Sequence, residues 1–189
     1  ITLRSFEEKF SLINNTEILN YIFETKIHTK NISDYFKLER KLNILDYERR
    51  IKFFCRRKNL NKKKFFFRKI NKSLYLRLNS KIDLGNYSDL ILNKKLFYFG
   101  KKLVLDQLIF DLVDQKVSKE RFSEIFEILQ HWKIKKNPVN GNDIKKLGVS
   151  DGLKIGKLLK IIEIWWIRKN FKPLKKDCIN HIKNYLPRC

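Results

Sequence analysis

The sequence predicts an all-α protein, in which a multi-helix bundle is followed by a smaller helical tail with a helix-hairpin-helix-like turn. Three observations lead to this fold class. Apolar residues recur at intervals of three or four through most of the chain, which is the helical period. The 189 residues include only 6 Gly and 3 Pro. Neither internal repeats nor the pattern of a parallel sheet can be found, so no α/β domain is expected.

The N-terminal part is expected to be helical. Residues 2–23 carry an apolar helical stripe with a break at residues 14–15. A second stripe predicts helix across residues 31–59 and consists of Tyr35, Leu38, Leu42 and Leu45. In residues 72–79 three leucines alternate briefly with other residues, so a short strand is an alternative to the helix that we expect there.

Further elements follow from glycine, serine and proline positions. Residues 88–114 predict two helices that meet near Gly100, where glycine supplies either a left-handed C-terminal residue or a close packing point. Ser118 is expected to cap a helix that extends to residue 132, and Pro138 ends that segment. We therefore expect two domains, a helical body of residues 1–130 and a basic helical tail of residues 131–189.

The tail contains four of the six glycines, all within residues 137–160. We expect a short helix over residues 142–147, a turn through positive φ at Gly148, and Ser150 as the cap of a long amphipathic helix. A last helix is expected near residues 176–185. The stripe of the long helix is interpreted as the core of the tail, its tryptophans as packing residues rather than base-stacking platforms: Ile155, Leu158, Leu159, Ile162, Trp165 and Trp166.

The start of the long helix has the chemistry of a phosphate-binding site. A helix that begins at Asp151 and Gly152 presents backbone N–H groups at the positive end of its dipole. Gly156 lies inside the helix, where glycine costs about 1 kcal/mol relative to alanine, so we expect close approach by the preceding helix or by a ribose-phosphate strand. A corner in an ordinary helical bundle is the alternative. The lysines within a turn or two of this point are Lys145, Lys146, Lys154 and Lys157.

The net charge of +23 is concentrated in two blocks. Residues 40–72 carry 14 Lys and Arg against 2 Asp and Glu, residues 131–189 carry 15 against 4, and the remainder carries 14 of each. Clustered positive charge indicates a polyanionic partner, in particular a nucleic acid, and a solvated Lys-rich face is the alternative. No apolar run approaches the length of a membrane span. The candidate binding residues of the first block are Arg49, Arg50, Lys52, Arg56 and Arg57.

Cysteine and histidine usage gives no indication of chemistry in this chain. An odd count of three widely spaced cysteines is typical of a reducing compartment. Cys178 and His181 are the only pair at ligand-like spacing, and without a second pair we expect no metal site. The other histidines lack partners of any catalytic pattern, so no catalytic residue is expected. The chain begins at Ile1 and contains no Met, from which we expect it to be a fragment.

Residues 137–179 resemble the C-terminal end of bacterial tRNA nucleotidyltransferases, the CCA-adding enzymes, and of the related poly(A) polymerases. Upstream, the segments "LFYFGKKLVLDQLIFD" and "EILQHW" resemble the family's body region. Ser150 and Asp151 depart from the family, in which Lys or Ser followed by Pro is common. The matching positions of the tail are Pro138, Gly141, Asp143, Leu147, Gly148, Gly152, Gly156, Trp165, Trp166 and Phe171.

The resemblance implies a body and tail without their catalytic head. The family's head uses a Gly-Gly hairpin and an Asp-x-Asp pair, and its neck a Glu-Asp-x-x-Arg run, none of which occurs here. Mg²⁺ and CTP or ATP are therefore expected in a head and neck that normally belong to the same polypeptide, and no cofactor is expected in this chain. The partner implied is tRNA, held along its acceptor and TΨC stem and at its elbow.

Several alternatives stay open at this point. The glycine hairpin also fits a helix-hairpin-helix module that binds duplex DNA nonspecifically, or the tail of a poly(A) polymerase. A scaffold or ribosome-associated protein with a basic surface is a further alternative. Within the family, CCA addition, A addition and partial CCA addition are not distinguished by these residues. A bacterial cytoplasm is the expected location, and an organellar matrix is the other.

Overall fold

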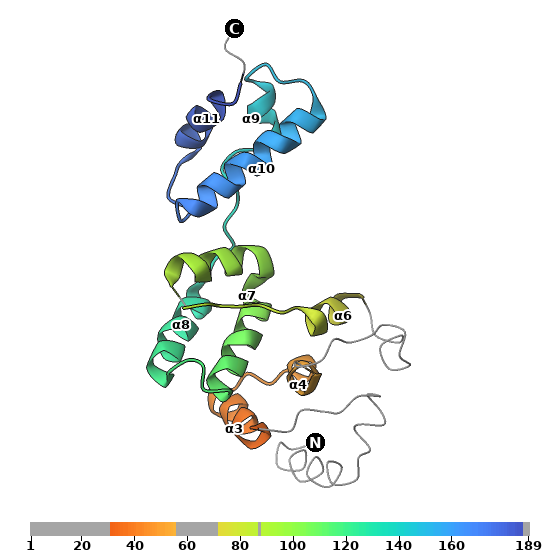
Figure 1. Ribbon diagram of the computed structural model, residues 1–189, viewed down its shortest axis with the longest axis vertical. Helices are drawn as coiled ribbons and strands as arrows, with labels where there is room; N and C mark the ends of the chain where they lie inside the picture. Colours follow the sequence, from red (N-terminus) through yellow and green to blue (C-terminus); the bar gives the residue numbers. More distant parts are fainter. Residues whose placement is uncertain (1–30, 56–71, 87, 187–189) are drawn as a thin grey trace. The chain divides into compact units, whose positions relative to one another are not determined.

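The computed structural model describes residues 31–55, 72–86 and 88–186, and all regular secondary structure in these ranges is α-helical (Figure 1). The predicted all-α class is confirmed for this part of the chain, which contains no strand of an α/β domain. None of its helices is long and apolar enough to cross a membrane. The helix expected in residues 2–23 lies outside the described residues, as do Arg56 and Arg57.

The described ranges contain helices of 5 to 25 residues. Their bounds are α3 (Ile32–Leu42), α4 (Tyr47–Cys55), α6 (Lys72–Asn79), α7 (Asp89–Val113), α8 (Lys119–His131), α9 (Gly141–Lys145), α10 (Gly152–Arg168) and α11 (Lys175–Lys183).

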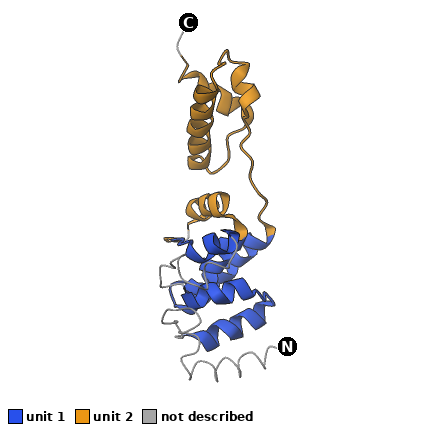
Figure 2. Ribbon diagram, turned by 90° about the vertical axis from the view of Figure 1, so that its right-hand side faces the viewer, with its two compact units in different colours: residues 1–83, 102–130 blue, residues 84–101, 131–189 orange. Residues whose placement is uncertain are grey.

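The chain forms two compact units, which are coloured separately in Figure 2. Unit 1 comprises residues 1–83 and 102–130, and unit 2 comprises residues 84–101 and 131–189. The first part of α7 therefore packs with the residues that follow α8, and the rest of α7 packs with α3, α4 and α6. The domains predicted at 1–130 and 131–189 stay a prediction.

Unit 1 is built on aromatic packing between α3, α4 and α7. The rings of Tyr35 and Phe53 stack with their centroids 4.4 Å apart, and the ring of Phe110 lies 5.4 Å from that of Phe53. All three side chains are buried. Rings of this size supply much apolar burial, so these contacts fix the three helices around one core.

The single helix expected across residues 31–59 is wrong, because the chain breaks between α3 and α4. Asn43 adopts φ 50° and ψ 43°, a left-handed conformation that asparagine tolerates better than most residues. Asp46 then accepts a hydrogen bond from the Arg49 N–H at 3.0 Å. Leu45, assigned to the apolar stripe, lies in this break and is 62% exposed.

Other predicted features of the body agree with the structure. Residues 72–79 form a helix, α6, rather than a strand. Ser118 caps α8, its hydroxyl accepting from the Arg121 N–H at 3.2 Å. Gly100 interrupts α7 with φ 76° and ψ 165°, a region of the backbone map that is essentially restricted to glycine. No atom lies within 4 Å of the position that a Cβ would take there, so conformation rather than close packing requires this glycine.

Unit 2 has its own core around α10. The stripe predicted on this helix is confirmed: Ile155, Leu158, Ile162 and Trp166 are buried, and Leu159 and Trp165 pack against them. The buried partners from other elements include Val139, Ile144, Cys178 and Ile182. The indole N–H of Trp166 donates to the Pro173 carbonyl at 3.1 Å, and the ring of Trp165 stacks on His181 at 4.2 Å. Both tryptophans are therefore packing residues.

Candidate nucleic-acid interface

The helical hairpin predicted in the tail is present and is made by α9 and α10. The Asn140 side chain caps α9 by accepting from the N–H groups of Asn142 and Asp143, and Asp143 accepts in return from the Asn140 N–H. Gly148 has φ 87°, as the predicted turn requires. The chain thus ends a short helix, reverses through glycine and starts the long one.

The cap of α10 is Asp151, and the prediction of Ser150 is wrong. Because α10 begins at Gly152, Asp151 stands at the N-cap with φ −69° and ψ 118°, and its Oδ1 accepts from the Leu153 N–H at 2.8 Å. A carboxylate therefore already occupies part of the positive helix end. An incoming phosphate would share this end with Asp151, so the neighbouring ammonium groups matter more than the bare helix terminus.

The four predicted lysines of the hairpin are all exposed, and none of them forms an ion pair within the described residues. They are Lys145, Lys146, Lys154 and Lys157. Other lysines of unit 2 do pair, Lys160 with Glu163 and Lys175 with Asp143. The hairpin therefore presents ammonium groups that are not held in ion pairs within the described residues, although Asp143, whose pKa is lowered first by Lys175, also feels the charge of Lys146.

The predicted glycines of the hairpin are exposed as well: Gly148, Gly152 and Gly156. A Cβ added at any of them would meet no atom within 4 Å. The expected close approach of the preceding helix to Gly156 is therefore absent from the structure. The bare backbone of this position faces open space, which leaves approach by an external molecule as the remaining expectation.

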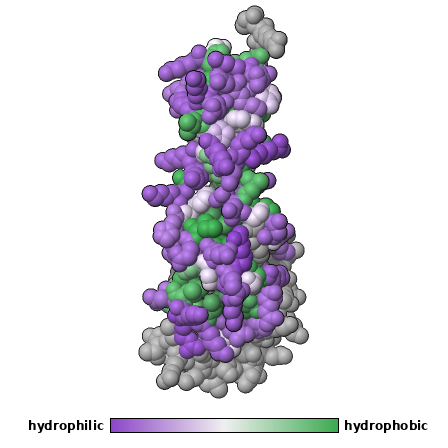
Figure 3. Space-filling model, turned by 90° about the vertical axis from the view of Figure 1, so that its left-hand side faces the viewer, coloured by the Kyte–Doolittle hydropathy of each residue, from purple (hydrophilic) through white to green (hydrophobic). Residues whose placement is uncertain are grey.

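A surface groove of about 700 Å³ lies beside the hairpin. The turn and the first half of α10 form one wall, and Tyr185 and Leu186, which follow α11, contribute to the lining. Apolar side chains including Leu158 and Ile161 alternate there with Lys154 and Lys157. Elsewhere, the face drawn in Figure 3 is covered mainly by hydrophilic side chains, and its hydrophobic side chains gather in separate patches.

The three described candidate residues of the first basic block lie inside unit 1 rather than on its surface. Arg49, Arg50 and Lys52 are only 4%, 8% and 3% exposed. The Arg49 Nε lies 2.8 Å from Asp106 Oδ1 and the Arg50 Nη2 lies 2.8 Å from Glu39 Oε2. Their role in RNA binding is untested, but their charged groups serve internal ion pairs.

The centre of these ion pairs is Asp106, which sequence reasoning missed. Arg77 donates from Nε and Nη2 to its two oxygens at 2.9 and 2.8 Å and also forms a bidentate pair with Asp46. Burial alone would lower the pKa of Arg77. Hydrogen bonds to Asp106 and Asp46 outweigh this effect and raise the pKa of Arg77. A signal was present in the sequence, because Asp106 and Gln107 are the only polar residues in the segment "LVLDQLIF".

Cysteines and histidines do not assemble a site in the described ranges. Within them, no group of three or more Cys, His, Asp and Glu residues could hold a metal ion. Burial raises the pKa of the Cys55 thiol to about 12, so this thiol stays protonated and unreactive near neutral pH. Cys178 is buried in the core of unit 2, and His181 stacks on Trp165.

Comparison with known proteins finds similarity over part of the chain. A stretch of 55 residues, 29% of the chain, is 34% identical to CCA tRNA nucleotidyltransferase 1, mitochondrial, from Mus musculus, and 36% identical to the protein of that name from Homo sapiens. The chain matches only 13% of the length of each relative. No family model matches the chain, and no solved structure matches it either.

These comparisons relate part of the chain to CCA tRNA nucleotidyltransferases. They agree with the family to which the tail glycines and tryptophans point. The finer assignments, a bacterial type and a position at the C-terminal end, are taken up below as proposals.

The ion pairs around Asp106 predict a large loss of stability on mutation. Replacing Asp106 by Asn leaves three buried cations without their shared carboxylate, which should cost about 3 to 5 kcal/mol of unfolding free energy. Asp34→Asn removes an exposed pair with Lys37 and should cost no more than about 1 kcal/mol. Urea titration of both variants measures this difference, and equal losses would show that the buried pairs do not stabilise unit 1.

Acid should weaken the same network. Burial alone would raise the pKa of Asp46. Hydrogen bonds from Arg77 and from the Arg49 N–H outweigh this effect and hold the pKa of Asp46 below its usual 3.8. A lowered folded pKa gives stability that is present above the unfolded value and is lost as pH falls through the folded value. Asp46→Asn should therefore destabilise the protein above about pH 4 and converge with the wild type in stronger acid. A gap between them that is independent of pH would contradict this.

The hairpin glycines should respond to alanine with opposite signs. Gly148→Ala forces a side chain onto positive φ and should destabilise by about 1 to 2 kcal/mol. Gly156→Ala adds a methyl group to a helix in open space and should stabilise by about 0.5 to 1 kcal/mol. Thermal unfolding of the two variants measures both changes. Destabilisation by Gly156→Ala would show that the protein's own packing requires this glycine.

Proposed function

We propose that this chain is the tRNA-binding C-terminal part, body and tail, of a bacterial-type tRNA nucleotidyltransferase that adds or repairs the 3′-terminal CCA. The observation that carries the proposal is the unpaired, exposed cluster of lysines on a glycine hairpin, in a chain that is partly similar to CCA tRNA nucleotidyltransferases. The acceptor and TΨC stem and the elbow of tRNA would be the region held.

The chemistry of the hairpin suits a folded RNA. Double-helical RNA offers its partners mainly phosphates, 2′-hydroxyl groups and overall shape, because side chains cannot read its deep major groove. Ammonium groups and backbone N–H groups bind phosphate without regard to sequence. The exposed backbone at Gly152 and Gly156 permits close approach of a sugar-phosphate strand. The ammonium groups are those of Lys145, Lys146, Lys154 and Lys157.

The reaction itself would take place outside these residues. No Gly-Gly hairpin, Asp-x-Asp pair or Glu-Asp-x-x-Arg run occurs in the sequence, so nucleotide transfer would require a head and neck in the same polypeptide. Mg²⁺ and CTP or ATP would bind to that head. The location would be a bacterial cytoplasm or an organellar matrix, and the two relatives carry the word mitochondrial in their names.

One alternative has a specific observation in its favour. The turn at Gly148, with an exposed backbone and basic neighbours, is also the chemistry of a helix-hairpin-helix module that binds duplex DNA. Competition between tRNA and duplex DNA of equal charge separates the two functions. A preference for tRNA supports the proposal, and equal affinity favours the DNA module.

The hairpin lysines should set the salt dependence of tRNA binding. Replacing Lys145, Lys146, Lys154 and Lys157 by Ala should weaken binding and reduce the slope of log K against log salt. The reduction should be roughly 0.7 to 0.9 for each phosphate that the protein no longer neutralises. Filter binding or fluorescence anisotropy over a range of salt concentrations measures the slope.

A matched variant controls for the change in net charge. The matched variant replaces four exposed lysines by Ala and so removes the same number of charges from outside both basic blocks: Lys37, Lys94, Lys116 and Lys119. This control should keep a slope near that of the wild type. Equal losses in both variants would mean that net charge alone holds the RNA, and incorporation of CTP or ATP by residues 1–189 alone would contradict the assignment of chemistry to a separate head.

A further inference from the structure

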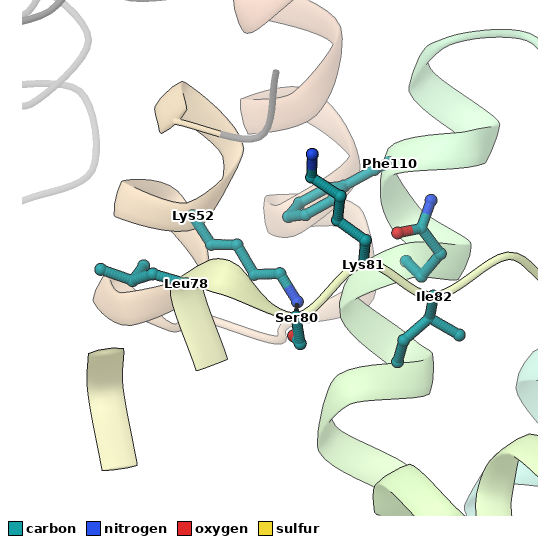
Figure 4. Close-up of a pocket in the computed structure, with 7 residues that line it drawn as sticks. Lys52, Leu78, Ser80, Lys81, Ile82 and Phe110 are labelled. Carbon is teal, nitrogen blue, oxygen red and sulfur yellow. Dashed lines mark hydrogen bonds between the residues drawn. The ribbon is translucent and has the colours of Figure 1, made fainter. Parts of the chain in front are cut away.

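Cations beside the cavities of this protein differ in whether they have partners inside it. Figure 4 shows a cavity of about 200 Å³ in unit 1, where the side chain of Lys52 reaches from α4 to Ser80. The Lys52 Nζ donates to the Ser80 Oγ at 2.9 Å and lies 3.7 Å from Asp106 Oδ2. This cation is therefore engaged within unit 1 and is not offered to an external partner.

Unit 2 contains a surface hollow between α7 and α10, the α7–α10 groove, whose volume is about 290 Å³. This volume lies just below the roughly 300 to 1,000 Å³ that is typical of ligand pockets, so the groove has room for side chains of a partner rather than for a large free ligand. It is lined by Leu90, Lys94, Tyr98, Ile164, Ile167 and Arg168.

One face of each helix forms a wall of this groove. Leu90, Lys94 and Tyr98 follow one another at intervals of four residues on the first part of α7, so they share one face of that helix. The three lining residues of α10 lie within one helical turn of each other. The groove is therefore bounded by two regular helix surfaces.

Contacts within unit 2 hold the two helices beside each other. The ring centroids of Phe97 and Trp166 lie 6.2 Å apart, and the Asn93 side chain donates to the Asn170 Oδ1 at 2.8 Å. Phe97 and Asn93 belong to α7, whereas Trp166 belongs to α10 and Asn170 follows it. The groove is therefore a feature of one compact unit.

The apolar walls of the groove are open to solvent. Leu90, Tyr98 and Ile164 are 44%, 45% and 37% exposed, whereas Ile167, which also lines the groove, is buried. Large apolar side chains that gather on a surface mark sites of interaction. A groove of this kind suits the apolar face of a third, amphipathic helix.

Two cations at the groove lack an acid. Lys94 and Arg168 are exposed, and neither forms an ion pair within the described part of the chain. Lys160, which also lies on α10, does pair with Glu163. No carboxylate lines the groove among the described residues. A partner that supplies both an apolar side chain and carboxylates would therefore complement it.

Other occupants fit the groove less well. A second copy of this chain would bring the same cations to it, and like charges that face each other weaken an interface. An RNA backbone would find no free N–H group, because the lining residues lie inside helices whose N–H groups bond internally. The ring of Tyr98, the only aromatic residue in the lining, already has the Lys160 ammonium group 5.6 Å from its centroid.

We propose that the α7–α10 groove docks an acidic amphipathic helix of a protein partner, whose apolar side chains enter the groove and whose carboxylates pair with Lys94 and Arg168. Burial of the apolar side chains stabilises such a complex, and the charge pairs orient it. The groove shares no lining residue with the hairpin, so this docking is independent of the proposed function.

The experiment measures binding of labelled synthetic peptides to residues 1–189 by fluorescence anisotropy. The probe carries Leu at positions i, i+3, i+4 and i+7 of a helix and Glu on the rest of its surface. One control peptide has Ser in place of each Leu, and another has Gln in place of each Glu. The probe should bind about tenfold more tightly than either control, because it alone offers both kinds of group. Absence of probe binding would overturn the proposal.

Protein variants test whether the probe binds in the groove. Leu90→Asp puts a carboxylate into the apolar wall, and Lys94→Glu combined with Arg168→Glu reverses the charge of its cations. Each variant should weaken binding of the probe about tenfold. The replaced side chains are exposed, so both variants should keep the melting temperature of the wild type. Lys37→Glu combined with Lys119→Glu makes the same change of net charge in unit 1 and should bind the probe as the wild type does.

The same variants distinguish the docked helix from the other occupants. Equal probe binding by the wild type and every variant would show that the net charge of +23 attracts the peptide to no particular place. A loss of tRNA binding confined to the groove variants would assign the groove to RNA. A dimer of the wild type that Leu90→Asp dissociates, measured by sedimentation, would assign it to a second copy. Each of these results would overturn the proposal.

Discussion

The constraint on which the structure depends is the separation of excess positive charge from the apolar cores. A charge inside a protein has to be paired, because removing it from water otherwise costs several kcal/mol. The two units meet this requirement differently. Unit 1 takes Arg49, Lys52 and Arg77 inside and gathers them around Asp106. Unit 2 leaves the lysines of its hairpin on the surface, where water solvates them.

The buried cations of unit 1 and the exposed lysines of unit 2 therefore have different roles. The buried cations hold α4, α6 and α7 together, since each of these helices contributes at least one member of the network. The exposed lysines of the hairpin form no ion pair within the described residues. The proposed RNA partner would account for their position around exposed glycine backbone.

The sequence was most informative where local chemistry decides the structure. The turn at Gly148, the cap at Ser118, the break at Gly100 and the buried stripe of α10 all follow from short-range rules, and the structure has each of them. Asp151 rather than Ser150 caps α10, because α10 begins one residue later than predicted and the Asp151 carboxylate accepts from the Leu153 N–H. The spacing of the leucines predicted one continuous helix, but the left-handed conformation of Asn43 ends α3 at Leu42.

Long-range pairing could not be predicted in the same way. Arg49 and Lys52 have the sequence signature of a basic surface, and their burial depends on Asp106, which lies more than fifty residues later in the chain. The hairpin lysines form no ion pair with a buried acid in the described residues, and their predicted exposure agrees with the structure. The comparison with CCA tRNA nucleotidyltransferases covers 55 residues and leaves their RNA contacts to experiment.

The central claim is that the backbone and lysines of the hairpin contact tRNA directly. Amide hydrogen exchange of the whole chain, with and without tRNA, tests it at the level of single segments. The account predicts added protection in residues 148–157, while the amides around Asp106 exchange at unchanged rates. Protection confined to other segments, with residues 148–157 unaffected by saturating tRNA, would contradict it.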